Sequence, residues 1–143
     1  MMTRILACIL CLGSLSLQAA ESKKTPNVIF VMADDLGIGD LQPTNPDCKI
    51  KTPHLLKMAQ EGITFLDAHS PSAVCTPTRY GVLTGRYNWR SRLARGVLNG
   101  TSEHLIPADR ATVAHLMREA GYHTQMIGKW HLGWDWAKVA NAN

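Results

Sequence analysis

The sequence has 143 residues, which allows one small hydrophobic core, near the short end of the roughly 100–200 residues usual for a domain. Lys and Arg number 15 against 11 Asp and Glu, giving a formal net charge of +4, and 45% of the residues are hydrophobic. This mild charge balance excludes a protein dominated by one sign of charge. The sequence contains no internal repeat or low-complexity tract of the kind that would indicate a fibrous or disordered chain.

Residues 1–20 have the order typical of a cleavable export signal. Residues 1–4 carry a positive charge, residues 5–17 are almost wholly apolar, and residues 18–20 end in small side chains. A membrane-spanning helix needs roughly 20 apolar residues, so this shorter run predicts no stable membrane anchor. A buried N-terminal helix is the alternative, but the polar residues 21–26 that follow favour a linker. We therefore expect the signal to be removed during export to a periplasm, a lysosome or the extracellular space.

An apolar strand followed by two acidic residues opens the remaining sequence. Residues 27–33 form a continuous apolar run after a proline, which predicts a strand buried on both faces of a parallel sheet. Asp34 and Asp35 follow directly, so they stand at the carboxyl end of this strand. In open α/β sheets ligands bind at that edge, and the two acids are therefore candidates for a binding site.

The rest of the chain alternates predicted helices and strands. Thr52 and Pro53 predict a helix start after a polar loop, and Gly62 predicts its end. The later elements are a strand at 63–68, an irregular loop at 70–76, a short helix at 78–84, a loop at 86–108, a helix at 112–120, a strand at 122–127 and a final loop. Seven apolar residues are expected to face the core from two of the helices: Leu55, Leu56, Met58, Ala59, Val113, Leu116 and Met117.

This order of elements predicts the fold class. Strands that alternate with helices argue for an α/β architecture with a mostly parallel sheet flanked by helices. Three strands make a thin sheet with exposed edges, which is a liability for an independent domain. We therefore interpret residues 21–143 as an incomplete, truncated domain.

Four arginines lie close together in the long loop, at positions Arg86, Arg90, Arg92 and Arg95. Such a cluster can bind nucleic acid or attract an anionic substrate. A solvated helix or loop face is the simpler interpretation, and we expect no nucleic-acid partner.

The strongest chemical signal is the segment Cys75-Thr76-Pro77-Thr78-Arg79, which an apolar helix and Thr84-Gly85-Arg86 follow. It resembles the signature of type I, formylglycine-dependent sulfatases. Segments 26–37, 52–62 and 128–133 also resemble their counterparts in the N-terminal part of these enzymes, in the same order. The alternative is a buried cysteine before a proline-started helix, and the joint order of the four segments speaks against it.

The resemblance implies an arylsulfatase-like sulfuric ester hydrolase with the alkaline-phosphatase-like sulfatase fold. Residues 21–143 would be the N-terminal part of its catalytic domain. In this family a formylglycine-generating enzyme oxidises the signature cysteine, which Cys75 matches, to the aldehyde formylglycine. One hydroxyl of the hydrated aldehyde attacks sulfur and displaces the alcohol, and the second hydroxyl then expels sulfate. The implied substrate is a small or carbohydrate sulfate ester.

Two acidic residues match metal ligands of the family. The resemblance implies that Asp34 and Asp35, with the group made from Cys75, hold one Ca²⁺ ion. Carboxylate oxygens are hard donors of the kind that Ca²⁺ prefers, in a shell of roughly 6–8. The family's remaining ligands come from the second half of its domain, so we expect this chain alone to be inactive.

Three further residues match catalytic positions. Arg79 lies four residues after Cys75, about one helical turn on, and can donate charge and hydrogen bonds toward the modified side chain. Lys129 and His131 match the pair that contacts sulfate and takes part in catalysis. On an extended segment, residues two apart point the same way. A solvated lysine and a structural histidine beside Trp130 are the alternatives.

Three other interpretations stay open. A phosphonate or phosphate ester hydrolase of the same fold would share the formylglycine signature. The chain could also be a non-catalytic fragment. Finally, Cys48 and Cys75 could form a structural disulfide, as two cysteines in an exported protein often do.

Overall fold

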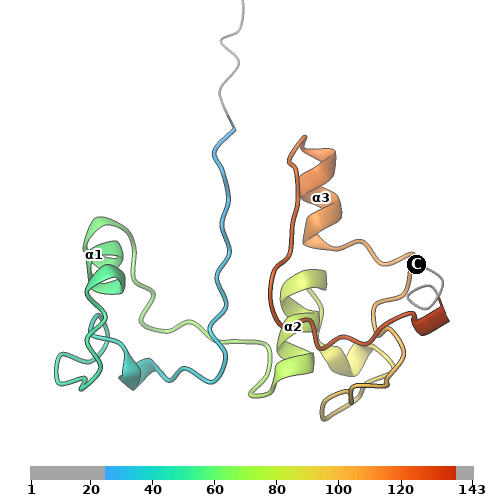
Figure 1. Cartoon of the computed structure of the whole chain (residues 1–143), viewed down its shortest axis with the longest axis horizontal. Coiled ribbons are helices and arrows are strands. Elements are labelled where there is room, and N and C mark those ends of the chain that lie inside the picture. The colour runs from blue at the N-terminus through green and yellow to red at the C-terminus, as the bar shows by residue number, and fades with distance from the viewer. Residues whose placement is uncertain (1–24, 138–143) are drawn as a thin grey trace, which may run out of the picture. The chain divides into compact units, whose positions relative to one another are not determined.

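The computed structural model describes residues 25–137, and the predicted signal peptide lies outside this part. The chain divides into two compact units, residues 1–32 and residues 33–143. The described residues of the first unit form no helix or strand. The second unit contains the 3-10 helices η1 (Ile38–Asp40) and η2 (Asn88–Arg90) and the α-helices α1 (Pro53–Glu61), α2 (Cys75–Thr84) and α3 (Val113–Glu119) (Figure 1). Within the described part of the chain, no helix is long and apolar enough to cross a membrane.

The bounds of α1 agree with the sequence. The helix begins at Pro53 and ends before Gly62, but the side chain of Thr52 makes no capping hydrogen bond. The Thr52 hydroxyl instead accepts from the backbone N–H of Gln42 at 3.2 Å, and the Gln42 side chain accepts from the Thr52 N–H at 2.6 Å. These reciprocal bonds close the polar loop in front of the helix. The predicted start is confirmed, because Thr52 occupies the N-cap position and Pro53 the first helical position, although the Thr52 side chain does not cap the helix.

The start of α2 lies earlier than predicted, at Cys75 instead of residue 78. Gly85, with φ 65°, ends the helix by donating its N–H to the carbonyl of Gly81 at 2.8 Å. The early start matters for function, because it places Cys75 in the first turn, where backbone N–H groups have no partner within the helix. The third helix, α3, lies inside its predicted range.

The predicted parallel sheet does not form in the part of the chain that the structure describes. Residues 27–33, 63–68 and 122–127 form no strands there, and the β-type pairing consists of one isolated parallel bridge between Glu103 and Trp134. Both residues of the bridge lie in segments predicted as loops. Residues 25–137 therefore consist of helices joined by irregular segments, and a mostly parallel sheet flanked by helices stays a prediction.

The physical reason is that the apolar pattern is present but is not buried. A strand is stabilised by hydrogen bonds to a neighbour and by burial of an apolar face. The side chains of Val31, Ile63 and Ile127 are each more than four-fifths exposed. Apolar side chains of the helices are exposed as well. Met58 in α1 and Leu116 in α3 were both predicted to face a core, and they are 66% and 59% exposed.

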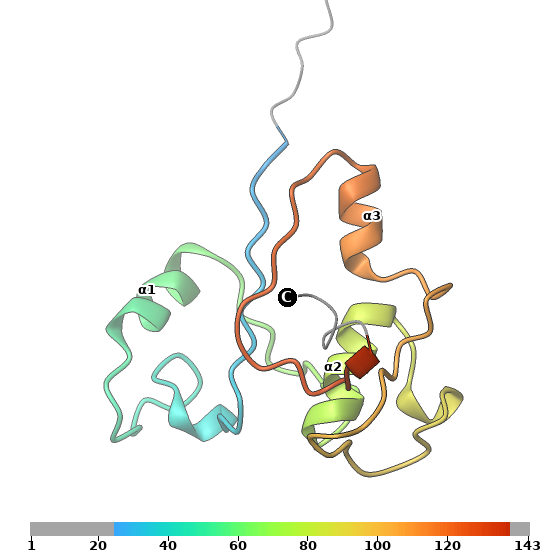
Figure 2. The same cartoon turned by 45° about the vertical axis from the view of Figure 1, so that its right-hand side comes forward.

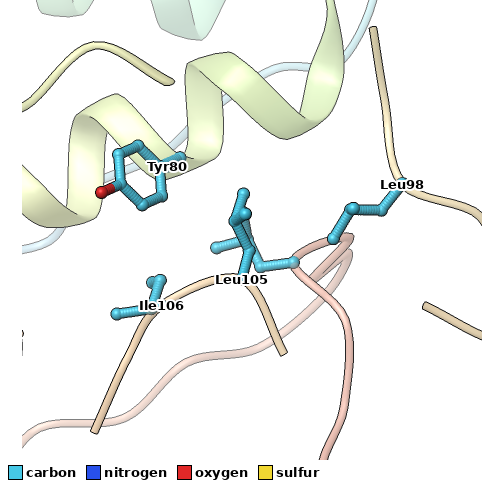
Figure 3. Close-up of a cluster of buried hydrophobic side chains, with 5 residues drawn as sticks. Tyr80, Leu98, Leu105 and Ile106 are labelled. Carbon is cyan, nitrogen blue, oxygen red and sulfur yellow. The ribbon is translucent and has the colours of Figure 1, made fainter. Parts of the chain in front are cut away.

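The buried core forms beside α2. Tyr80 of α2 packs with Leu98, Leu105, Ile106 and Leu132, which come from irregular segments (Figure 3). The Leu105 N–H donates to the Leu132 carbonyl at 2.8 Å and joins two of these segments. The chain that follows α3 therefore returns to α2, where it meets the helix that begins at the signature cysteine (Figure 2).

Candidate active site

Four of the predicted site residues lie together at the start of α2. The Sγ of Cys75 lies 3.3 Å from the Nζ of Lys129 and 4.0 Å from Oδ1 of Asp34. Lys129 donates to Oδ2 of Asp34 at 2.6 Å, and the Nη2 of Arg79 lies 3.3 Å from Oδ1. Asp34 and Lys129 are 95 residues apart, so tertiary folding assembles this group. We call Asp34, Cys75, Arg79 and Lys129 the Cys75 cluster.

Arg79 ties the cluster to the loop that follows α3. Its Nη1 donates to the backbone carbonyl of Lys129 at 2.6 Å, while its Nη2 contacts Asp34. Cys75 and Arg79 are four residues apart in α2, so their side chains lie on one face of the helix. The side chain of Arg79 is only 12% exposed, and its Nε is buried without a hydrogen-bond partner among the described residues, so Nη1 and Nη2 make its contacts.

Charge pairing shifts the pKa values of two members of the cluster. The hydrogen bond from Lys129 is the main cause that lowers the pKa of Asp34 below its ordinary value of 3.8, against the opposing effect of desolvation. The same hydrogen bond, followed by the one to Cys75, raises the pKa of Lys129 above its ordinary value of 10.5. Near neutral pH, Asp34 is therefore an anion and Lys129 a cation.

Replacing Lys129 with methionine is expected to raise the pKa of Asp34 toward 3.8, because the main hydrogen bond to the carboxylate is lost. In the unmodified protein, the stabilisation of the fold by the charged Asp34 carboxylate is fully present above pH 3.8. It is lost as the pH falls through the lowered pKa of Asp34. The stabilisation of the fold by the charged Lys129 ammonium is fully present below pH 10.5. It is lost as the pH rises through the raised pKa of Lys129. A pH titration of the Asp34 carboxyl ¹³C signal measures the shift.

The matched control for this titration is Lys57→Met. Lys57 lies 3.7 Å from Glu61 on the exposed surface of α1, so its loss should leave the titration of Asp34 unchanged. An Asp34 titration that is the same with and without Lys129 would show that the two side chains do not pair in solution.

Two predicted site residues stand outside the Cys75 cluster. Within residues 25–137, Asp35 makes no hydrogen bond or ion pair, and its backbone has φ 54°. His131 directs its Nε2 to the backbone carbonyl of Leu98, at 2.8 Å. The backbone of His131 also has φ 54°, so the chain is not extended there. The expectation that an extended segment points Lys129 and His131 the same way is therefore wrong.

The predicted metal ligands assemble only in part. No group of three or more His, Cys, Asp or Glu side chains that could hold a metal ion occurs in the described range of the chain. Asp34 contacts Cys75 but is also held by Lys129 and Arg79, whereas among the described residues no hydrogen bond or ion pair joins Asp35 to Cys75. In the described residues Asp34 therefore lies near Cys75 without Asp35, and the set of Asp34, Asp35 and Cys75 as metal ligands stays a prediction.

The disulfide alternative is wrong, because Cys48 and Cys75 are both free thiols. Cys48 is buried, and its Sγ donates to the backbone carbonyl of Ile50 at 3.2 Å. Cys75 is half-buried and lies in the cluster described above. Its thiol therefore remains available for chemical modification.

Thr76 and Leu98 belong to the site, although sequence analysis did not single them out. Thr76 is fully buried, and its hydroxyl bonds to the backbone of both Leu98 and His131. Its place beside Cys75 in the signature was the available signal. Leu98 offered none, because it lies in a loop without apolar periodicity.

Known proteins resemble this chain over most of its length. A family model described as sulfatase matches residues 26–142. N-acetylgalactosamine-6-O-sulfatase from Bacteroides thetaiotaomicron is 44% identical over 113 residues, which cover 79% of this chain and 22% of that protein. Steryl-sulfatase from Homo sapiens is 42% identical over 123 residues, which cover 80% of this chain and 20% of that protein.

A solved structure shows the same relationship. It comes from a study of the metabolism of multiple glycosaminoglycans by Bacteroides thetaiotaomicron, and its chain is 46% identical with a TM-score of 0.71. The match covers 76% of this chain and 22% of that chain, so this chain spans about a fifth of the length of these relatives. The family match includes every residue of the Cys75 cluster. The chain therefore belongs to the sulfatase family.

Proposed function

We propose that the protein carrying this chain hydrolyses sulfate esters, and that residues 21–143 form the N-terminal part of its catalytic domain. The observation that carries this proposal is the contact of Cys75 with Lys129, beside Arg79, in a chain of the sulfatase family. Two cations next to the position of a nucleophile attract and orient an anionic ester. Because the chain spans about a fifth of its relatives, we assign the activity to the whole protein, called here the parent protein, and propose that residues 21–143 alone are inactive.

Cys75 is the residue that we propose a formylglycine-generating enzyme converts to formylglycine. In the structure it is a thiol, and its Sγ stands where an oxygen of the aldehyde or its hydrate would be. The position fits this role, because it lies in the first turn of α2 and its Sγ accepts a hydrogen bond from Lys129. The hydrated aldehyde would supply one hydroxyl that attacks sulfur and a second that releases sulfate.

The other residues of the Cys75 cluster bind and orient. Lys129 contacts position 75 and carries the positive charge for the sulfate group, while Asp34 holds its ammonium in place. Arg79 fixes the backbone of Lys129 and adds a second positive charge. We propose that His131 also contacts the sulfate, and that the substrate is a small or carbohydrate sulfate ester. The names of the relatives, a sulfatase of N-acetylgalactosamine and one of steryl compounds, support this range.

Asp34 and Asp35 are the residues that we propose to hold one Ca²⁺ ion. Their chemistry fits, because the lowered pKa keeps the Asp34 carboxylate ionised and the exposed Asp35 carboxylate has no partner within the described residues. Two carboxylates supply part of a shell of roughly 6–8 oxygens, so further ligands must come from elsewhere in the parent protein. The ion would supply positive charge that polarises a sulfate oxygen.

We further propose that residues 1–20 direct export of the parent protein and are then removed. The charged, apolar and small-residue order of this segment supports export to a periplasm, a lysosome or the extracellular space. Its apolar run is too short for a stable anchor, which requires roughly 20 apolar residues.

The test of the proposed function compares a sulfate ester and a phosphate ester of the same alcohol as substrates of the parent protein. We expect sulfate to be released over many turnovers, at a rate that falls when Ca²⁺ is chelated and recovers when it is restored. Preference for the phosphate ester would identify a phosphonate or phosphate ester hydrolase instead. Hydrolysis of neither ester would identify a non-catalytic protein, and either result overturns the proposal.

A further inference from the structure

Three residues beside the Cys75 cluster form a closed ring of hydrogen bonds. The hydroxyl of Thr76 donates to the backbone carbonyl of His131 at 2.9 Å. The Nε2 of His131 lies 2.8 Å from the carbonyl of Leu98, and the Leu98 N–H donates to the Thr76 hydroxyl at 3.2 Å. The ring therefore joins the first turn of α2 to the loop before α3 and to the loop after it.

The ring fixes the tautomer of His131. A carbonyl oxygen can only accept a hydrogen bond, so the Nε2 that contacts Leu98 must carry the proton. In a neutral imidazole the other nitrogen, Nδ1, is then unprotonated and can accept a proton or a hydrogen bond. Within the described part of the chain, Nδ1 is buried and has no partner. Nδ1 is therefore the ring nitrogen left to accept a hydrogen bond.

The ring also holds His131 in an uncommon backbone conformation. A non-glycine residue with φ 54° lies in the left-handed region, which persists where the surroundings constrain it. Thr76 is 0% exposed and Leu98 is 7% exposed, so the polar atoms of the ring depend on one another for hydrogen bonds. His131 is followed in the sequence by Leu132, which belongs to the core. Lys129 of the Cys75 cluster lies two residues before His131.

We propose that Thr76 is a positioning residue that holds the imidazole of His131 as its Nε2–H tautomer. It acts through the carbonyl of His131 and the backbone of Leu98, and it leaves Nδ1 for the sulfate or for the group at position 75. This inference rests on the proposed function, because it serves the contact between His131 and the reacting groups. The Thr76 hydroxyl donates its proton within the ring and its side chain is fully buried, so Thr76 itself does not need to touch substrate.

The parent protein with Thr76→Val tests this inference, because valine keeps the shape of threonine and loses the hydroxyl. We expect kcat to fall by up to about a hundredfold, as when a catalytic group is misplaced, with KM changed by less than about threefold. Thr76→Ser keeps the hydroxyl and is expected to restore most of kcat. Thr84→Val is the matched control, because the Thr84 hydroxyl donates to the Tyr80 carbonyl one turn back, at 2.6 Å, and kcat should stay unchanged.

A second readout does not depend on sulfatase activity. The ring ¹⁵N signals of His131, assigned by their loss in His131→Gln, distinguish the two tautomers. We expect the Nε2–H tautomer in the parent protein and a mixture in Thr76→Val.

Three results would overturn the positioning role: an Nδ1–H tautomer in the parent protein, an unchanged tautomer in Thr76→Val, or an equal loss of kcat in Thr84→Val. A parent protein that hydrolyses no sulfate ester would instead overturn the proposed function. In that case the ¹⁵N signals still decide whether Thr76 positions His131.

Discussion

Replacing Cys75 with serine is expected to lower the turnover of sulfate esters by the parent protein at least about a thousandfold, with the fold intact. The two side chains are nearly the same size, so packing around this half-buried position hardly changes. Serine cannot form a hydrated aldehyde and therefore has no second hydroxyl to expel sulfate. Attack beside Lys129 would leave a sulfated serine with no internal route of release.

The intact mass of the variant after incubation with substrate measures this outcome. We expect at most one turnover per molecule and a mass gain of one sulfate group, which peptide mapping places at position 75. Cys48→Ser is the matched control, because Cys48 is the other free thiol and should be dispensable for turnover. Arg79→Ala should slow catalysis without trapping sulfate, since it removes charge and leaves the route of release. Many turnovers by Cys75→Ser at the parent's rate would exclude formylglycine chemistry.

Local signals in the sequence predicted the helices well. Pro53 and Gly62 mark the ends of α1, because a proline suits a first helical position and a glycine suits the position after the last. Gly85 ends α2 for a related reason, since it adopts the left-handed conformation that completes the cap. The predicted start of α2 at residue 78 lies three residues after the observed start at Cys75, because a proline is tolerated within the first turn and so Pro77 does not fix where that turn begins.

The Cys75 cluster was predictable only through the family motif. Nothing in the spacing of Asp34 and Lys129 indicates that their side chains meet, and the motif placed both at one site. Leu98 escaped prediction because it acts through its backbone N–H and carbonyl, which every residue type shares. Thr76 escaped prediction because its hydroxyl binds backbone groups of residues far along the chain. The left-handed backbone of His131 was likewise invisible, because glycine is the residue that usually signals it.

The predicted sheet shows the limit of periodicity. An apolar run such as residues 27–33 indicates that a segment can be buried on both faces, and it does not specify the neighbour that buries it. In the described residues the core instead forms from Tyr80 and side chains on irregular loops, among them Leu105 and Leu132. Their burial depends on the loop conformation, which a count of apolar residues at helical or strand spacing does not detect.

Gly133→Ala is expected to destabilise the parent protein strongly. Gly133 has φ 74°, a conformation that costs an L residue roughly 1–2 kcal/mol. A Cβ at this position would also overlap the backbone carbonyl of Glu103, which cannot swing aside as a side chain would. The bridge between Glu103 and Trp134 must then shift, and with it the nearby hydrogen bond from Leu105 to Leu132.

Gly121→Ala separates the conformational cost from the cost of overlap. Gly121 has φ 86°, and among the described residues other than its two chain neighbours no atom lies within 4 Å of an added Cβ. The free energy of unfolding of this variant should therefore fall by only roughly 1–2 kcal/mol. For Gly133→Ala we expect a loss of about 3–5 kcal/mol, because displaced backbone and weakened hydrogen bonds add to the same conformational term. Urea unfolding of both variants measures the difference. Since His131 lies two residues before Gly133, turnover should fall in Gly133→Ala and stay near the parent's value in Gly121→Ala. Equal destabilisation of the two variants would mean that the close approach of Gly133 to Glu103 does not hold this loop in place.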